Sequence, residues 1–153
     1  MLNVVLVEPE IAANAGNIAR TCACIGARLH LVEPMGFRPT ERNLKRAGCD
    51  YWDKVDIVRW THLGAFLEEH GRDELFLFTG RADAGFADVA YPDGCFLVFG
   101  RESRGLDGEL LDALPDRCVR IPMASGCRSL NLSNAVAVAA YEALRQQGFP
   151  GLA

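Results

Sequence analysis

The first group of residues that could do chemistry lies near the start of the chain, between Glu8 and Arg20. On a period of 3.6 residues, Gly16, Asn17 and Arg20 share one face of a helix that follows an apolar run. A bare backbone, an amide and a guanidinium near a helix N-terminus suit a phosphate group or a ribose. A capped helix with a solvated arginine explains the same residues, so this segment alone leaves both interpretations open.

A second group follows an apolar run near residue 99, where Gly100 and Gly105 flank Glu102. Glycines placed so soon after a strand indicate a tight turn in which the backbone closely approaches another group. The Glu102 carboxylate could accept a hydrogen bond from an amine or a hydroxyl of a ligand. It could equally cap the backbone of a neighbouring segment, and the sequence does not decide between these two roles.

The third group is a polar run near the C-terminus that contains Ser129, Asn131, Ser133 and Asn134. These side chains exceed what one helix cap requires, which indicates a loop shaped around a ligand. Residues 135–141 then carry apolar side chains on every side of a predicted helix. Such a helix needs a cover on both sides, so the sequence predicts a homodimer, with burial inside a single chain as the alternative.

A basic stretch lies between the first and second groups. It contains Arg42, Lys45 and Arg46, which fall on one helical face because they are three and four residues apart. The whole chain is acidic, with 16 basic and 20 acidic residues and a formal net charge of −4. Because nucleic-acid binding needs only a local basic patch, these three residues are candidate contacts to a nucleic-acid phosphate backbone. A solvated helix face is the ordinary alternative.

An α/β domain is needed to position these groups. Short β-rich runs alternate with helical segments, which predicts a mainly parallel sheet flanked by helices, with residues 1–153 as a single domain. The predicted strands are residues 2–7, 28–32, 55–59, 75–79, 95–99 and 118–121. The predicted helices are residues 15–25, 41–47, 62–70, 107–113 and 133–147, with Asn14, Thr40 and Thr61 as N-caps and Gly26, Gly48, Gly71 and Gly148 at their ends. The polar groups then lie in loops at the ends of strands, where parallel sheets bind ligands.

Composition excludes several other classes of protein. The chain has 153 residues, 50% of them hydrophobic, and no apolar run approaches the roughly 18 residues of a membrane helix. The N-terminus does not resemble a secretory signal peptide and the six scattered cysteines fit reduced thiols, so we expect a cytoplasmic protein that is not bound to membranes. The three histidines lack metal-ligand spacing, and no metal site is expected. The glycine signatures of dinucleotide sites, P-loops and serine hydrolases are absent.

The polar groups also form an ordered series of motifs. They are Glu8-Pro9-Glu10, Asn14-x-Gly16-Asn17-Ile18-x-Arg20, Phe99-Gly100-x-Glu102-x-Arg104-Gly105-Leu106, Ile121-Pro122-Met123 and Arg128-Ser129-Leu130-Asn131-Leu132-Ser133-Asn134-Ala135-Val136. In this order and spacing they resemble the SPOUT class of knotted RNA methyltransferases, and within it the minimal YibK/TrmL type that acts on the wobble nucleotide of tRNA. The similarity covers essentially the whole chain, and the combination is highly specific although each piece alone is not.

The resemblance implies a fold and a cofactor. It implies a C-terminal trefoil knot formed from about residue 75 onward, as a known exception to the rule that chains do not thread their own loops. It also implies a site for S-adenosylmethionine, without a metal, made by three loops. The residues that match these loops are Phe78, Thr79, Gly80, Gly100, Glu102, Gly105, Ile121, Met123, Ser129 and Leu130.

The implied reaction is methyl transfer from a sulfonium to the ribose 2′-hydroxyl of the wobble nucleotide, with leucine tRNAs as the expected substrates. The matching catalytic residues are Arg20, Asn17, Ser129 and Asn131. Because a guanidinium stays protonated in proteins, we expect Arg20 to clamp the nucleotide's phosphate and stabilise the developing alkoxide, while the other three orient the ribose or the arginine. Two alternatives remain: a methyltransferase acting on another RNA position, such as in ribosomal RNA, and a non-catalytic RNA-binding dimer of the same fold.

Overall fold

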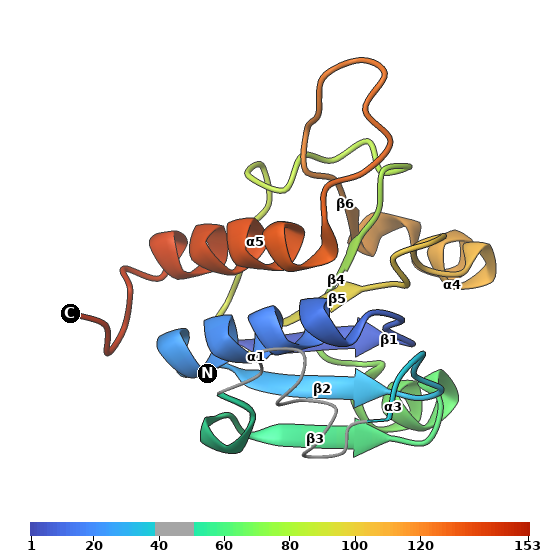
Figure 1. The fold of residues 1–153 in the computed structure, drawn as a ribbon. Helices are drawn as coiled ribbons and strands as arrows, with labels where there is room; N and C mark the ends of the chain where they lie inside the picture. The colour runs from blue at the N-terminus through green and yellow to red at the C-terminus, as the bar shows by residue number, and fades with distance from the viewer. Residues whose placement is uncertain (39–50) are drawn as a thin grey trace.

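A six-stranded sheet forms the centre of the computed structural model, which describes residues 1–38 and 51–153 (Figure 1). The strands are β1 (Asn3–Val7), β2 (Arg28–Val32), β3 (Ile57–Trp60), β4 (Leu75–Phe78), β5 (Phe96–Phe99) and β6 (Cys118–Val119). Their order across the sheet is β3-β2-β1-β5-β4-β6, and every neighbouring pair is parallel. The predicted parallel sheet is therefore confirmed.

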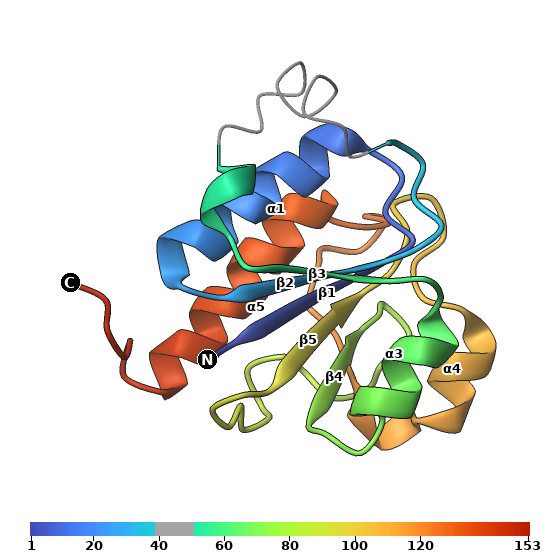
Figure 2. The same cartoon turned by 90° about the horizontal axis from the view of Figure 1, so that it is seen from below.

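In the described part of the chain, helices cover both faces of this sheet (Figure 2). On one face α1 (Ala12–Ile25) and α5 (Leu132–Gln146) lie side by side, and on the other lie α3 (Leu63–His70) and α4 (Gly108–Ala113). Two 3-10 turns, Trp52–Lys54 and Pro115–Arg117, complete the described elements. Parallel sheets are normally covered in this way because their connections place helices on the two faces.

The alternation of side chains along β1 explains the two layers of the core. Val4 and Leu6 pack under α1 and α5, whereas Val5 and Val7 pack under α3 and α4. All four side chains are buried. Since both faces of the strand are covered, its sequence is continuously apolar after Asn3 and does not alternate with polar residues.

The predicted boundaries hold for most elements, with two corrections at helix starts. Helix α1 begins at Ala12 with Ile11 as its N-cap, so the prediction of Asn14 as the cap is wrong. The N-cap of α3 is His62 and not Thr61, because the His62 Nδ1 atom accepts a hydrogen bond from the Ala65 amide at 3.1 Å.

At the end of α1, Gly26 has a φ of 65°, the left-handed conformation predicted for a glycine stop. Gly71 is the C-cap of α3, and Gly148 follows the C-cap of α5. The predicted helix at 41–47, with Thr40 and Gly48, lies outside the described residues.

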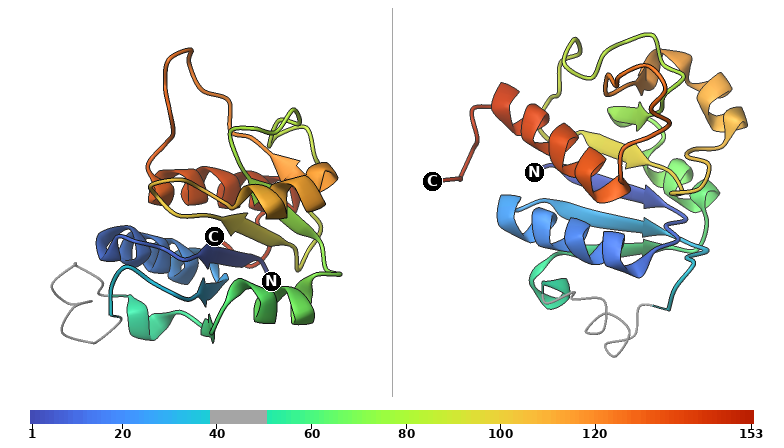
Figure 3. Two further views of the ribbon diagram at one scale, coloured as in Figure 1. Left: turned by 90° about the vertical axis from the view of Figure 1, so that its right-hand side faces the viewer. Right: turned by 45° about the horizontal axis from the view of Figure 1, so that its top comes forward.

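After β6 the chain makes a long excursion before it returns to the sheet (Figure 3). Residues 122–131 are exposed, and α5 then packs against α1 and β5. Because parallel strands bring their carboxyl ends to the same edge, the loops after β1, β4, β5 and β6 meet there. None of the helices found in residues 1–38 and 51–153 has the length and hydrophobicity that crossing a lipid bilayer requires.

Candidate functional site

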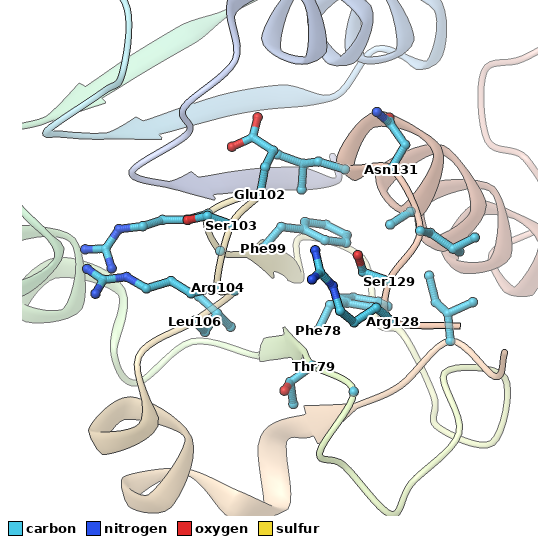
Figure 4. Close-up of a pocket in the computed structure, with 18 of the residues that line it drawn as sticks. Phe78, Thr79, Phe99, Glu102, Ser103, Arg104, Leu106, Arg128, Ser129 and Asn131 are labelled. Carbon is cyan, nitrogen blue, oxygen red and sulfur yellow. The ribbon is translucent and has the colours of Figure 1, made fainter. Parts of the chain in front are cut away.

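A cavity of about 600 Å³ lies at the carboxyl edge of the sheet (Figure 4). Its size falls within the range of small-molecule sites. All ten residues predicted to bind the cofactor line it: Phe78, Thr79, Gly80, Gly100, Glu102, Gly105, Ile121, Met123, Ser129 and Leu130. They come from three segments that are far apart in the chain, so the fold brings together what the sequence separates.

Two aromatic rings form one wall of this cavity. Phe78 ends β4 and Phe99 ends β5, the neighbouring strand, so both rings project from the same edge of the sheet. Their centroids are 4.6 Å apart and their planes differ by 13°, a stacked arrangement. Both side chains also belong to the buried core under α1 and α5. The wall is thus apolar and held in place from behind.

The turn after β5 exposes backbone to the cavity. Gly105 has a φ of 73°, and Arg101 and Gly105 exchange backbone hydrogen bonds of 2.8 and 3.2 Å across the turn. A Cβ atom added at Gly100 would lie 2.1 Å from the Gly105 carbonyl carbon and 2.2 Å from the Leu106 nitrogen. Only glycine at position 100 permits this turn, which confirms the predicted close approach of backbone.

Glu102 lies at the tip of that turn, and its carboxylate binds the start of α1. Its Oε2 atom accepts a hydrogen bond from the Glu10 amide at 2.7 Å, and its Oε1 atom accepts from the Ile11 amide at 3.1 Å. The Asn14 side-chain amide donates a third bond to Oε1, also at 3.1 Å. Of the two roles that the sequence left open, the structure therefore shows the cap of a neighbouring segment.

Asn14 extends this network to α5. Its Oδ1 atom accepts a hydrogen bond from the Asn131 side-chain amide at 3.0 Å. The Oδ1 atom of Asn131 in turn caps α5, accepting from the Ser133 amide at 2.9 Å and from the Asn134 amide at 3.4 Å. One chain of hydrogen bonds, from Glu102 through Asn14 to Asn131, thus fixes the starts of α1 and α5 against the turn after β5.

A second set of contacts joins the segment after β1 to the turn after β5. The Arg101 guanidinium forms ion pairs with Glu8, by an Nε–Oε2 bond of 2.8 Å, and with Asp107 at 3.2 Å. The Glu10 carboxylate accepts from the amide and the hydroxyl of Ser103 at 2.8 and 2.9 Å. The Ser103 bonds are the main reason why the pKa of Glu10 is lowered, with smaller contributions from Arg101 and Arg104.

The structure separates the residues predicted to be catalytic into two places. Ser129 and Asn131 line the cavity. Asn17 and Arg20 do not: both are exposed on α1, and the Arg20 guanidinium lies 4.8 Å from the centroid of the Tyr51 ring. A single chain therefore does not bring the four residues together.

The predicted RNA contacts Arg42, Lys45 and Arg46 lie outside the described residues. In the part of the chain that the structure does describe, no group of three or more His, Cys, Asp or Glu side chains could hold a metal ion.

Sequence analysis missed the role of Asn14, which is buried and borders the cavity. A signal was present, since an asparagine within the first turn of a helix is uncommon unless its side chain bonds elsewhere. The four arginines of the cavity lining were also not predicted as site residues; they come from three separate loops and are Arg81, Arg101, Arg104 and Arg128.

Several known proteins are similar to this chain in sequence and in fold. A tRNA (cytidine(34)-2′-O)-methyltransferase of Escherichia coli (strain K12) is 50% identical over 152 residues, which cover 99% of this chain and 97% of that protein. A solved structure from work on the 2-OH methylation of C/U34 on tRNA matches with a TM-score of 0.90 and 47% identity, covering 97% of each chain. The SpoU methyltransferase AviRb of Streptomyces viridochromogenes, in complex with AdoMet, matches with a TM-score of 0.80 and 26% identity, over 96% of this chain and 58% of that one.

The sequence profile of the SpoU rRNA Methylase family matches residues 1–141. With the relatives above, this match confirms the resemblance to the SPOUT class that the motifs predicted. The parallel sheet, the loops at its carboxyl edge and the profile all lead to one assignment: the chain belongs to the SpoU rRNA Methylase family.

Proposed function

We propose that this protein transfers a methyl group from S-adenosylmethionine to the ribose 2′-hydroxyl of nucleotide 34, the wobble nucleotide, of tRNA, with leucine tRNAs as substrates. The observation that carries the proposal is the 50% identity with the tRNA (cytidine(34)-2′-O)-methyltransferase of E. coli over 99% of the chain. As this relative modifies tRNA, the protein is expected to work in the cytoplasm. Residues 1–153 act as one methyltransferase domain.

The cavity fits the methyl donor. Its volume of about 600 Å³, its stacked wall of Phe78 and Phe99 and the bare backbone around Gly100 and Gly105 suit a ligand with a flat base and many polar groups. When bound, S-adenosylmethionine supplies an activated methyl group on a sulfonium, so no metal is needed. The residues that would hold it are the ten predicted cofactor-binding residues, which belong to three loops and line the cavity.

The side chains of this protein must then position the ribose and stabilise its 2′-oxygen while the hydroxyl proton passes to solvent water. Arg20 clamps the phosphate of the target nucleotide and stabilises the alkoxide that develops on the 2′-oxygen. The Ser129 hydroxyl, at the cavity, orients the ribose, and Asn17 supports the arginine. Because both polar ends of Asn131 are engaged with Asn14 and with the start of α5, its contribution is to hold the loop in place.

The active form is a homodimer in which Arg20 serves the cavity of the second copy. Two observations support this: Arg20 and Asn17 lie outside the cavity of their own chain, and α5 exposes Val138 and Tyr141, which are 41% and 48% accessible. An apolar helix face of this kind is normally covered by another protein surface.

The fold also includes a C-terminal trefoil knot. The strand order supports it, because β6 lies at the sheet edge next to β4, whereas α5, the next element in the chain, packs against α1 and β5.

The proposed activity is tested with purified protein, labelled S-adenosylmethionine and transcripts of leucine tRNAs. We expect incorporation of label at nucleotide 34, abolished when that nucleotide carries a 2′-deoxyribose. Labelling of ribosomal RNA but not of tRNA would point to the first alternative, and binding of RNA without any transfer would point to an idle dimer.

The role of Arg20 is tested by single-turnover methylation. Arg20→Ala should lose at least 100-fold in rate, and Arg20→Lys should recover only part of it because lysine lacks the bidentate geometry. A near-normal rate in Arg20→Ala would remove this residue from the mechanism. Heterodimers of Arg20→Ala and Ser129→Ala subunits should regain activity, since one of their two sites is then intact.

The basic stretch outside the described residues is a further proposed contact to RNA. In a triple alanine variant of Arg42, Lys45 and Arg46, RNA affinity in filter binding should fall and the salt dependence should become shallower by about 1 per residue. Unchanged affinity would mean that these side chains form a solvated face only.

A further inference from the structure

The charged residues of the cavity lining are mostly positive, although the protein as a whole is acidic. They are four arginines, at positions 81, 101, 104 and 128, and one glutamate, Glu102. The whole chain has a formal net charge of −4. Positive charge is thus concentrated at the one place where the proposed reaction needs a ligand.

Two of these five charges are already compensated within the chain. Arg101 is paired with Glu8 and Asp107, and Glu102 accepts three hydrogen bonds from the start of α1. The remaining three, Arg81, Arg104 and Arg128, are exposed.

Within the described part of the chain, the guanidinium groups of these three arginines form no ion pair or hydrogen bond. The positive charge of Arg104 contributes to the lowered pKa of Glu10, but both oxygens of the Glu10 carboxylate accept hydrogen bonds from Ser103. Some exposed arginines elsewhere are paired, such as Arg59 with Glu33 at 2.5 Å and Arg145 with Glu142 at 2.8 Å, whereas Arg72 and Arg120 are exposed and have no ion pair in the described part of the chain.

The three arginines come from three loops that border the cavity. Arg81 follows β4, Arg104 follows β5, and Arg128 precedes α5. In Figure 4 the Arg128 side chain reaches into the cavity near Phe99 and Ser129, whereas Arg104 extends from the turn after β5 in the opposite direction. They therefore form a broad positive rim and not a clamp around one small group.

Such a rim opposes binding of the methyl donor alone. S-adenosylmethionine carries a sulfonium and an ammonium against one carboxylate, so its net charge is positive. Its product, S-adenosylhomocysteine, lacks the sulfonium charge and is neutral overall. Uncompensated cations around the cavity repel the donor more than the product, whereas a polyanion at the rim removes this repulsion.

We propose that Arg81, Arg104 and Arg128 form a phosphate-binding rim for the RNA substrate, and that RNA bound there raises the affinity of the cavity for the positively charged methyl donor. This inference rests on the proposed function. It makes the two substrates bind cooperatively through charge, and it favours release of the neutral product without a change of shape.

The three arginines could bind one other anion of similar chemistry, which is the carboxylate of S-adenosylmethionine itself. The two sources predict opposite results when an arginine is neutralised. If the arginines bind RNA phosphates, donor affinity in the absence of RNA rises; if they bind the carboxylate, it falls.

The experiment uses Arg→Gln variants at the three positions, singly and together, with Arg72→Gln as the control. Arg72 is also exposed, lies outside the cavity lining and precedes β4, at the opposite edge of the sheet. Calorimetry measures the affinity for S-adenosylmethionine and for S-adenosylhomocysteine, with and without an anticodon stem-loop whose target nucleotide is 2′-deoxy and cannot be methylated. Filter binding measures RNA affinity against salt.

For the triple variant we expect the preference for S-adenosylmethionine over S-adenosylhomocysteine, without RNA, to rise about eightfold, because each of the three charges contributes roughly a factor of two at these separations in water. RNA affinity should fall roughly 100-fold at 0.1 M salt, with a salt slope shallower by about 2 to 3. RNA should raise donor affinity in the wild type and much less in the triple variant. Arg72→Gln should change none of these quantities.

Weaker binding of both small ligands in the triple variant would overturn the proposal in favour of a carboxylate clamp. Unchanged RNA affinity would overturn it in favour of a solvated rim. If the wild-type protein binds neither S-adenosylmethionine nor S-adenosylhomocysteine, the proposed function itself is wrong. If it binds both ligands but their affinities do not change in the triple variant, only the proposal about the three arginines is wrong.

Discussion

Two clusters of hydrogen-bonded polar side chains cross-link this fold, and only one of them borders the cavity. The first is the chain of hydrogen bonds from Glu102 through Asn14 to Asn131. The second lies under α3, where the Trp60 indole N–H donates to His30 Nδ1 at 3.1 Å and His30 Nε2 meets the Asn3 side-chain oxygen at 3.2 Å. Both clusters are satisfied internally.

The difference between them shows that a perturbed ionisable group does not by itself locate a site. Burial lowers the pKa of His30 from 6.5 to about 4, with smaller contributions from His70 and Arg28. Yet His30 is 2% exposed, packs against Phe66 and Phe96, and does not line the cavity. The first cluster holds loops that face the cavity, whereas the second holds strands and a helix to each other.

The largest effect that separates the two clusters is expected from Gly100→Ala. The added Cβ would meet backbone atoms at 2.1 and 2.2 Å, which cannot move without opening the turn that carries Glu102. We expect a loss of about 3 kcal/mol or more in unfolding free energy and no measurable donor binding. Denaturant unfolding and calorimetry check this. In the control Gly108→Ala the new Cβ meets only the end of the Arg81 side chain, at 3.5 Å, so stability should be nearly unchanged.

Removing the carboxylate that starts the first cluster should have the next largest effect. Glu102→Ala leaves two backbone amides and the Asn14 amide without their acceptor, which we expect to cost about 2–3 kcal/mol of stability. Methylation should fall by at least tenfold, because the turn and α1 lose their connection. Thermal unfolding and kcat/KM measure the two effects. Glu68→Ala, at an exposed position in α3, should change neither.

How far the sequence predicts this fold depends on how many residues separate two contacting side chains along the chain. The strand Asn3–Val7 follows directly from a run of buried apolar residues, and the glycine stop at Gly26 follows from local backbone geometry. The ten predicted cofactor-binding residues, all of which line the cavity, are identified by motifs that resemble a family, and the sheet then brings their loops together. Neither signal requires knowledge of which distant side chains meet.

The partners within the first cluster could not be predicted in this way. Glu102 and Asn14 are 88 residues apart in the chain, and Asn14 and Asn131 are 117 apart. Asn14 is a good N-cap by residue type, so local rules assigned it a role that Ile11 holds in the structure. Only the strand order, which places β5 beside β1, makes Glu102 the acceptor for the start of α1.

The second cluster should reveal itself through pH and not through catalysis. His30 is neutral in the folded protein down to about pH 4, whereas an unfolded histidine takes up its proton near pH 6.5. Between these values the unfolded state binds more protons, so stability is complete above pH 6.5 and falls by about 2.5 kcal/mol as the pH is lowered from 6.5 to 4. Denaturant unfolding at several pH values measures this slope.

The variant His30→Gln separates this titration from packing. Its amide can accept from Trp60 and donate to Asn3 as His30 does, but it does not titrate. The decline between pH 6.5 and 4 should therefore become much shallower, while methylation at pH 7.5 stays unchanged. An unaltered slope would show that other groups cause it, and a loss of methylation would mean that the two clusters are not separate.

The smallest expected effect is the coupling inside the first cluster, and a double-mutant cycle on Asn14→Ala and Asn131→Ala measures it. Each single change should lower the unfolding free energy by about 1 kcal/mol, since Asn131 also caps α5 and Asn14 also donates to Glu102. Their combined effect should fall short of the sum by about 0.5–1 kcal/mol, because the bond between them is lost only once. The matched cycle of Asn14→Ala with His30→Gln should be additive, since no hydrogen bond among the described residues joins the two clusters. Additivity in the first cycle would mean that Glu102 and Asn131 stabilise their helices independently, and the distinction between a connected site and a connected core would then disappear.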